Sequence, residues 1–155
     1  MRLTSHTDFA LRLLMSLAVV EERLVTIEEL ATRHKLSRNH LMKVAQTLVS
    51  LGYVTGIRGR TGGLTLARPA STIRIGEVVR TLEHDMRLVE CLGDGPTTCI
   101  LSGACLLTRS MNRALEAFFA SLDEVTLADL VAPRRVLRQR LGINSRGDAR
   151  IAATA

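Results

Sequence analysis

The sequence predicts a mainly α-helical fold with one small β-hairpin, arranged as a winged helix-turn-helix and followed by a long dimerisation helix. Two short segments of helical periodicity, Ile27–His34 and the stretch after Ser37, are separated only by a tight turn. A glycine-rich hairpin with arginines at its tip follows directly, and a long amphipathic pattern lies further on, at Gly103–Leu122. At 155 residues, the chain is expected to form one domain with an added dimerisation element.

The N-terminal part begins with an amphipathic helix, expected over Ser5–Val20 because apolar residues recur there with helical spacing. Thr26 and Glu29 then form the pattern of a capping box, in which two side chains satisfy backbone N–H groups at a helix start. Ser37 is placed to cap the next helix, and Gly52 is placed to end it. The sequence thus predicts three helices before the hairpin.

The last of these three helices has one apolar face and one polar face. Leu41, Val44 and Leu48 share the apolar face, whereas Asn39 and Lys43 lie on the opposite one. The polar face offers donors for phosphates and base edges and carries no acid, which is typical of a recognition helix in a major groove. An ordinary surface helix, the alternative, normally shows Glu–Lys pairs, and this helix has none.

Tyr53–Ile57 and Gly63–Ala67 are expected to pair as two strands, with Arg58 and Arg60 projecting from the tip between them. A basic hairpin directly after a recognition helix is a wing, which lies along the DNA backbone or in the minor groove. Arg2, near the N-terminus, can reach a phosphate. The residues expected to contact DNA are Arg2, Ser37, Arg38, Asn39, His40, Lys43, Arg58, Arg60, Thr61 and Gly62.

Charge is segregated along the chain, whose net charge is +6. Residues 30–76 contain eight lysines and arginines and no acid, whereas residues 77–132 contain four cations and nine acids. A surface that faces phosphates requires such an absence, because one misplaced carboxylate opposes binding. The acid-free stretch also leaves few general bases, so the chain is not expected to be an enzyme.

Past the hairpin, the pattern predicts a short helix over Ile75–Leu82, the long helix of Gly103–Leu122 and a final turn from Thr126. The long helix has a second apolar flank, Leu106 and Phe119, which favours a dimer interface over packing within its own subunit. The expected division is 1–82 for DNA binding, 83–105 for a cysteine loop, 103–132 for the dimerisation helix and C-terminal turn, and 133–155 for a basic, mobile tail.

All three cysteines lie within fifteen residues, at Cys91, Cys99 and Cys105, in a C-x7-C-x5-C pattern. Glycine, aspartate and proline make the first interval a loop, which is poor material for a buried core. A disulfide would leave one thiol over, and structural zinc sites bring closely spaced cysteine pairs that this chain lacks. We therefore favour an iron–sulfur cluster with a fourth ligand from elsewhere. Cys105 is expected in the first turn of a helix capped by Ser102, where backbone N–H groups favour a thiolate.

Several short segments together resemble one family of regulators over roughly residues 1–132. They are the opening Met-Arg-Leu-Thr-Ser-His-Thr-Asp-Phe-Ala-Leu-Arg, Ser37-Arg-Asn-His-Leu-Met-Lys-Val, Gly52-Tyr-Val-Thr, Arg58-Gly-Arg-Thr-Gly-Gly-Leu, Pro69-Ala-Ser, Ile75-Gly-Glu-Val-Val-Arg and the cysteines. With them, the sequence is similar to the winged-helix iron–sulfur regulators that include IscR, RirA and NsrR. Thr126-Leu-Ala-Asp-Leu is similar to the NsrR branch in particular.

The resemblance implies a transcriptional repressor that binds a partly palindromic operator in double-stranded DNA as a homodimer and releases it when nitric oxide nitrosylates the cluster. It implies one 4Fe–4S cluster per subunit, held by Cys91, Cys99 and Cys105, with Asp8 of the partner subunit as the fourth ligand. The competing candidates for that ligand lie near the loop: His84, Glu90 and Asp94. The wide first cysteine interval argues against a 2Fe–2S cluster, the alternative.

Two other functions stay open on the sequence. RirA-like iron sensors have similar cysteine spacing, so iron availability or redox state is an alternative signal. A cluster-free adaptor, whose cysteines are regulatory thiols, is the second. The N-terminus lacks the features of a signal peptide, and the apolar run Leu13–Val20 is too short for a membrane span, so a cytoplasmic protein without membrane contact is expected.

Overall fold

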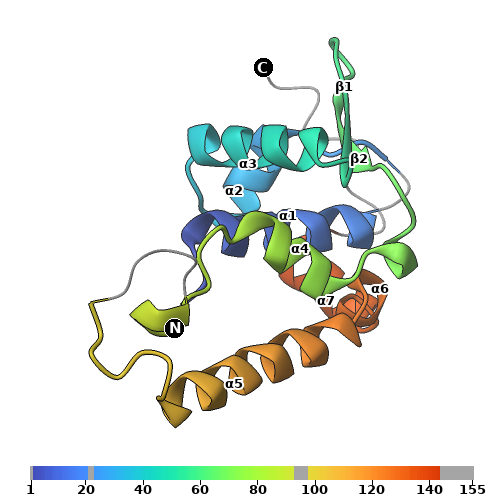
Figure 1. Ribbon diagram of the computed structural model, residues 1–155. Helices are drawn as coiled ribbons and strands as arrows, with labels where there is room; N and C mark the ends of the chain where they lie inside the picture. Colours follow the sequence, from blue (N-terminus) through green and yellow to red (C-terminus); the bar gives the residue numbers. More distant parts are fainter. Residues whose placement is uncertain (1, 21–22, 93–97, 144–155) are drawn as a thin grey trace.

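The computed structural model describes residues 2–20, 23–92 and 98–143 and confirms the mainly helical winged fold (Figure 1). In chain order the elements are α1 (Ser5–Val20), α2 (Ile27–His34), α3 (Arg38–Ser50), β1 (Val54–Ile57), β2 (Gly63–Leu66), η1 (Ala70–Thr72), α4 (Ile75–Leu82), η2 (Glu90–Leu92), α5 (Leu106–Asp123), α6 (Leu127–Leu130) and α7 (Arg134–Arg140), where η denotes a 3-10 turn. α1, α2 and α4 have the predicted bounds. None of the described helices is both long and apolar enough to cross a lipid bilayer.

Helix α1 runs through the middle of the molecule and supplies much of the core (Figure 1). Leu13, Leu14 and Ala18 of this helix are fully buried. α3 and the hairpin pack on one side of α1, and α4, α6 and α7 pack on the other (Figure 1). The half that contains α3 and the hairpin and the C-terminal half of the fold therefore share one central helix.

The start of α2 shows one of the two hydrogen bonds of the predicted capping box. The side chain of Thr26 accepts a hydrogen bond from the backbone N–H of Glu29. The Glu29 carboxylate pairs with Arg23 at 2.6 Å and with Arg33 at 2.8 Å. Burial by itself would raise the pKa of Glu29, but these two guanidinium groups outweigh burial and lower it.

A tight turn with Lys35 in the left-handed conformation, at φ 53°, joins α2 to α3. Ser37 stands at the N-cap position of α3 as predicted, but its side chain makes no capping hydrogen bond with the described residues. Gly52, at φ +73°, follows the C-cap Leu51 and ends the helix. α3 is thus held in place by packing more than by its N-terminal cap.

The hairpin is antiparallel, with Val54 opposite Leu66 and Ile57 opposite Gly63. Its tip is closed by a hydrogen bond from the N–H of Gly62 to the carbonyl oxygen of Gly59. A Cβ on Gly62 would clash with the carbonyl oxygen of Ile57, so the tight tip requires glycine at this position.

Helix α5 begins three residues later than predicted. Gly103 has a φ of +85°, a left-handed conformation that cannot continue into a right-handed helix. The helix therefore starts at Leu106, with Cys105 rather than Ser102 at the N-cap position. The expectation that Cys105 lies within the first turn was wrong by one position.

The C-terminal half of α5 packs against α4. Arg80 forms an ion pair with Asp123 at 2.6 Å, and its guanidinium lies 4.4 Å from the ring centroid of Phe119. Gly76 lets the two helices approach closely, because a Cβ there would overlap the Asp123 carboxylate. Phe119, which we assigned to an intersubunit flank, thus contacts α4 of its own subunit.

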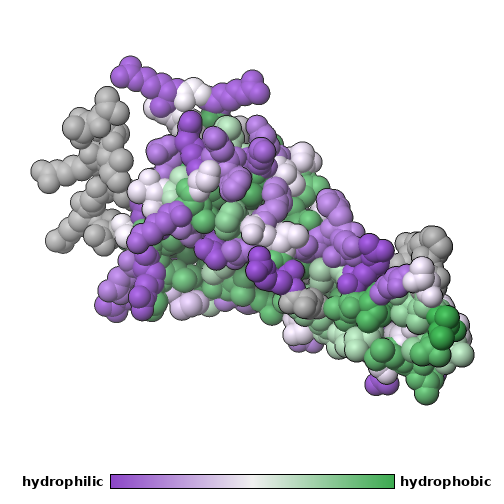
Figure 2. All heavy atoms as spheres, turned by 90° about the vertical axis from the view of Figure 1, so that its left-hand side faces the viewer, coloured by the Kyte–Doolittle hydropathy of each residue, from purple (hydrophilic) through white to green (hydrophobic). Residues whose placement is uncertain are grey.

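The N-terminal half of α5 extends away from the body as an arm (Figure 1). All eighteen residues of α5 are described, and none of them is buried. Figure 2 shows the arm as a largely apolar surface. Its most exposed large apolar residues are Leu106 (74%) and Leu107 (52%), and the turn before the helix adds Ile100 (96%) and Leu101 (61%).

For residues 133–143, the expectation of a mobile tail was wrong. α7 packs against α1, and Arg134 and Arg138 donate hydrogen bonds to the carbonyl oxygen of Val19 at 3.2 and 3.3 Å. Val136 is exposed, but three apolar residues of this segment join the core or pack against it: Leu137, Leu141 and Ile143. Their spacing among the arginines was the signal that the sequence reading missed. Residues 144–155 lie outside the described part of the chain.

Candidate nucleic-acid interface and cysteine site

The predicted DNA-contacting residues occupy one end of the molecule. α3 and the hairpin tip both lie at the top of Figure 1, on the side of α1 opposite α5. The following residues are exposed: Ser37, Arg38, Asn39, His40, Lys43, Arg58, Arg60 and Thr61. Arg2 is also exposed but precedes α1, and Gly62 is half-buried in the hairpin. The ring of His40 lies 6.5 Å from that of Phe9, beside α1.

Residues 30–76 contain no acid, but acidic side chains from the flanking elements form ion pairs with some of their cations. Arg38 pairs with Glu28 at 3.3 Å, and Arg68 pairs with Glu77 at 2.9 Å. Lys43 and the wing residues Arg58 and Arg60, by contrast, form no ion pair with any described residue. The unpaired cations of the recognition helix and the wing can therefore meet phosphates without first breaking an internal ion pair.

The cysteine site is assembled from η2, the loop after it and the first turn of α5. The Cys91 sulfur lies 3.1 Å from the hydroxyl oxygen of Thr108, three residues after Cys105. The Glu90 carboxylate accepts hydrogen bonds from the backbone N–H and the hydroxyl of Thr98, at 2.9 and 3.1 Å. The first contact joins η2 to the N-terminal end of α5, and the second joins the two sides of the loop to each other. No pattern in the sequence indicated the contact of Thr108.

All three cysteines have intermediate exposure. The backbone N–H groups of Thr108 and Leu107 lower the pKa of the Cys105 thiol, as expected at a helix N-terminus. Within residues 2–20, 23–92 and 98–143, no three cysteine, histidine or acidic side chains are grouped closely enough to hold a metal ion. The donor chemistry suits a soft metal cluster, whereas one subunit alone does not gather the ligands around a common point.

The candidate fourth ligands have different surroundings. Asp8, on α1, pairs with Arg12 at 2.6 Å, and its side chain is 44% exposed. His84 is exposed, and Glu90 is engaged with Thr98. Asp94 lies outside the described residues.

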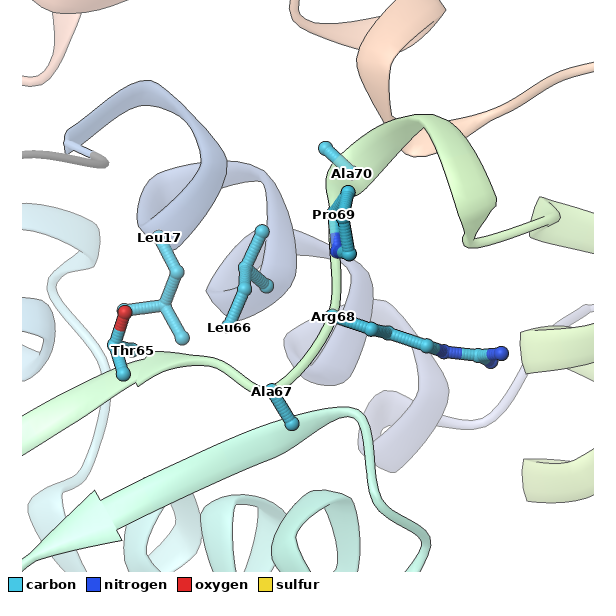
Figure 3. A pocket seen from close by; sticks show the side chains of 7 residues that line it. All are labelled: Leu17, Thr65, Leu66, Ala67, Arg68, Pro69 and Ala70. Carbon is cyan, nitrogen blue, oxygen red and sulfur yellow. The ribbon is translucent and has the colours of Figure 1, made fainter.

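A surface hollow between α1 and the segment after β2 does not provide a further reactive site. Figure 3 shows its lining: Leu17, Thr65, Leu66, Ala67, Arg68, Pro69 and Ala70. The side chain of Arg68 points away from the hollow, and its guanidinium lies 4.9 Å from the Tyr53 ring centroid and binds Glu77. Its lining otherwise lacks a titratable group, so it offers no acid or base for catalysis.

Known relatives match nearly the whole chain. The NsrR transcriptional regulator of Bacillus licheniformis is 44% identical over 142 residues, which cover 91% of this chain and 99% of that protein. The NsrR of Bacillus subtilis is 46% identical over 132 residues, which cover 84% of this chain and 90% of that protein. Both are helix-turn-helix transcriptional regulators and not enzymes.

Solved structures share the fold. The oxidised form of Staphylococcus aureus CymR superposes with a TM-score of 0.69 at 25% identity, covering 84% of this chain and 95% of that one. T. potens IscR superposes with a TM-score of 0.67 at 22% identity, covering 100% and 93%. Residues 3–133 match the Rrf2 family, described as iron-dependent transcriptional regulators. The chain therefore belongs to the Rrf2 family of transcriptional regulators and is of the NsrR type.

Proposed function

We propose that this protein is a homodimeric repressor that binds a partly palindromic operator and carries one iron–sulfur cluster per subunit, which senses nitric oxide. The observation that carries the proposal is the site itself. Cys105 stands at the N-cap of α5 and Cys91 contacts Thr108 in the first turn of that helix, on an arm whose apolar surface its own subunit leaves uncovered, and Cys99 lies in the loop between them. In this proposal residues 1–82 bind DNA, residues 83–105 hold the cluster, and residues 103–132 supply the dimer interface.

The residues present suit such a cluster. Cys91, Cys99 and Cys105 would provide three thiolates, the ligand type that holds most iron–sulfur clusters. The lowered pKa of Cys105 favours the thiolate, which is the form that binds iron. Three cysteines leave one iron of a 4Fe–4S cluster without a cysteine ligand. The alternative is a 2Fe–2S cluster, and visible absorption spectroscopy would distinguish the two cluster types.

Asp8 of the partner subunit is the proposed fourth ligand. Its carboxylate is paired with Arg12 near the surface of α1, where a second subunit can reach it. A carboxylate is a hard donor that binds cluster iron more weakly than a thiolate does. When bound, the cluster would supply one accessible iron at which nitric oxide reacts.

The path from this site to the DNA-binding face runs through α1. The Glu83 carboxylate, at the end of α4, accepts hydrogen bonds from the backbone N–H and hydroxyl of Thr4, at 2.7 and 3.0 Å. This contact joins the start of the cysteine-bearing segment to the start of the helix that carries Asp8. Freeing Asp8 would change how the two subunits are held, and with it the spacing of the two recognition helices. To move the dimer from 1:99 to 99:1 in favour of the DNA-binding arrangement, the cluster must bind that arrangement more tightly than the other by about 5.5 kcal/mol.

The DNA-binding part of the proposal is tested by salt dependence. Replacing Arg58 and Arg60 together by alanine removes two wing cations that no described carboxylate neutralises. We expect weaker operator binding and a slope of log Kd against log salt concentration that is smaller by about two.

Arg135→Ala, on α7, is the matched control, since it removes an exposed cation on the other side of α1 from α3 and the wing. It should leave the slope unchanged. An unchanged slope in the double wing variant would show that the wing does not contact phosphates.

A further inference from the structure

An apolar hollow lies along one side of the recognition helix. It is lined by residues of α3, by the first residue of α2 and by one residue of β2: Ile27, Met42, Ala45, Gln46, Val49, Ser50 and Leu64. Met42 is 41% exposed and Val49 is 43% exposed. These two side chains contribute little to the core, which α3 joins through other residues, and their exposure calls for an explanation.

The hollow borders the polar face that we assign to DNA. Met42 and Val49 are seven residues apart, so they lie two turns from each other on the same side of α3. Gln46 lies between them, at the edge of the row that contains Lys43. The base of the wing adds a wall, since a Cβ on Gly56 would lie 3.9 Å from Val49. A ligand that contacts the polar row therefore also meets the hollow.

The charges around the hollow favour DNA as its occupant. None of its seven lining residues is charged, and the exposed Lys43, which follows Met42 directly on α3, forms no ion pair with any described residue. In a major groove, the apolar group displayed among the polar base edges is the 5-methyl group of thymine. Glutamine is suited to the adenine of the same base pair, because its amide pairs with N6 and N7.

We propose that Met42 and Val49 recognise thymine methyl groups in the operator, with Gln46 placed to read the adenine of an A·T pair. This inference rests on the proposed function, since it requires α3 to enter a major groove. It adds a specificity to that function: half-sites with thymine at the positions facing the hollow are preferred over those without it.

Replacing thymine by deoxyuridine tests the inference, because the change removes only the methyl group and keeps the O4 acceptor. The probe is a duplex selected by the purified dimer from random-sequence DNA, with one thymine of a half-site replaced at a time. At fixed salt, we expect the Kd to rise about fourfold for each contacted methyl group that is removed. Thymines outside the facing positions should show no change.

Variants of α3 assign the effect to its residues. Met42→Ala and Val49→Ala should each bind the thymine probe less tightly and lose part of the thymine–uracil difference, while Met42→Leu, which stays apolar, should retain it. Leu51→Ala is the control, since Leu51 is 39% exposed at the end of α3 but does not line the hollow. Circular dichroism melting identifies any variant that fails to fold.

The outcomes separate this inference from the function on which it rests. If random DNA yields no selected duplex, DNA binding itself fails and the inference fails with it. If a duplex is selected and bound but every thymine tolerates deoxyuridine, only the methyl-recognition inference is overturned. Equal losses on thymine and uracil probes in Met42→Ala also overturn it, because they assign the hollow to another role, such as docking a protein.

Discussion

Glu83 stands where the DNA-binding body meets the segment that carries the cysteines. It is buried, and its carboxylate accepts two hydrogen bonds from Thr4, at the start of α1. Burial by itself would raise the pKa of Glu83, but hydrogen bonds from Thr7 and Thr4 outweigh burial and lower it. The folded state therefore favours the ionised carboxylate.

Glu83→Gln should lower the free energy of unfolding at pH 7 by about 1–3 kcal/mol, because the amide is a weaker acceptor than the buried carboxylate. The folded pKa of Glu83 lies below the ordinary value of a glutamate side chain. Its stabilisation is therefore present above that value and is lost as the pH falls through the folded pKa. Urea denaturation across pH 3–7 measures this, and the two proteins should converge in stability at the acidic end. A constant difference at every pH would assign the effect to packing instead.

At the scale of elements, α7 and the three residues after it pack against the C-terminal end of α1, and we call residues 134–143 the clamp. Ile143 is 4% exposed, and Arg33 of α2 donates a hydrogen bond to the carbonyl oxygen of Leu141. The clamp therefore touches both α1 and the helix-turn-helix.

A chain ending at Pro133 should be less stable by at least about 2 kcal/mol, because it loses the burial of Ile143 and its apolar neighbours. The melting temperature should fall by about 5 °C or more. A chain ending at Asn144 keeps α7 and serves as the control. Equal melting temperatures for the two truncated chains would show that α7 adds nothing to stability.

The arm formed by the start of α5 is the proposed dimer interface. Leu107→Glu places a charge in its apolar surface, and the burial of that charge against a second subunit is costly. We expect a monomer at micromolar concentration in sedimentation equilibrium, with unchanged helix content because no residue of α5 is buried in its own subunit. Val136→Glu, at a 54% exposed position on α7, should stay dimeric. If Leu107→Glu stays dimeric, the dimer interface does not lie on the arm.

Most elements could be predicted from local patterns. The 3.6-residue periodicity and the Thr26 cap fixed the bounds of α1, α2 and α4, since these signals lie within each segment. The start of α5 was missed because Ser102 resembles a cap, whereas the left-handed Gly103 excludes helix there. α7 was missed because arginines dominate its composition. Its few apolar residues can be recognised as core residues only once their packing against α1 is known.

The site was less predictable than the fold. The sequence indicated the three cysteines, but neither the contact of Cys91 with Thr108 of α5 nor the hydrogen bond from Thr98 to Glu90. Those contacts join residues brought together only by the path of the loop. Likewise, the acid-free stretch did not reveal that Glu28 reaches Arg38, because the acid comes from the neighbouring helix.

Across the whole molecule, two surfaces lie at opposite sides of α1. α3 and the wing form one, and the cysteine-bearing arm forms the other (Figure 1). A signal at the arm can alter the DNA-binding face only by changing how two subunits are arranged or by moving α1. The proposed partner ligand Asp8 combines both routes, because it lies on α1 and reaches the arm of another subunit.

The most direct test of this account is non-denaturing mass spectrometry of the anaerobically purified protein on operator DNA, before and after addition of a nitric oxide donor. We predict a dimer with one 4Fe–4S cluster per subunit, whose cluster mass changes as the DNA is released. Cys99→Ala, the control, should carry no cluster and bind the operator poorly. A colourless dimer that still binds DNA would contradict the account, as would a cluster that ignores nitric oxide and is lost only on iron chelation.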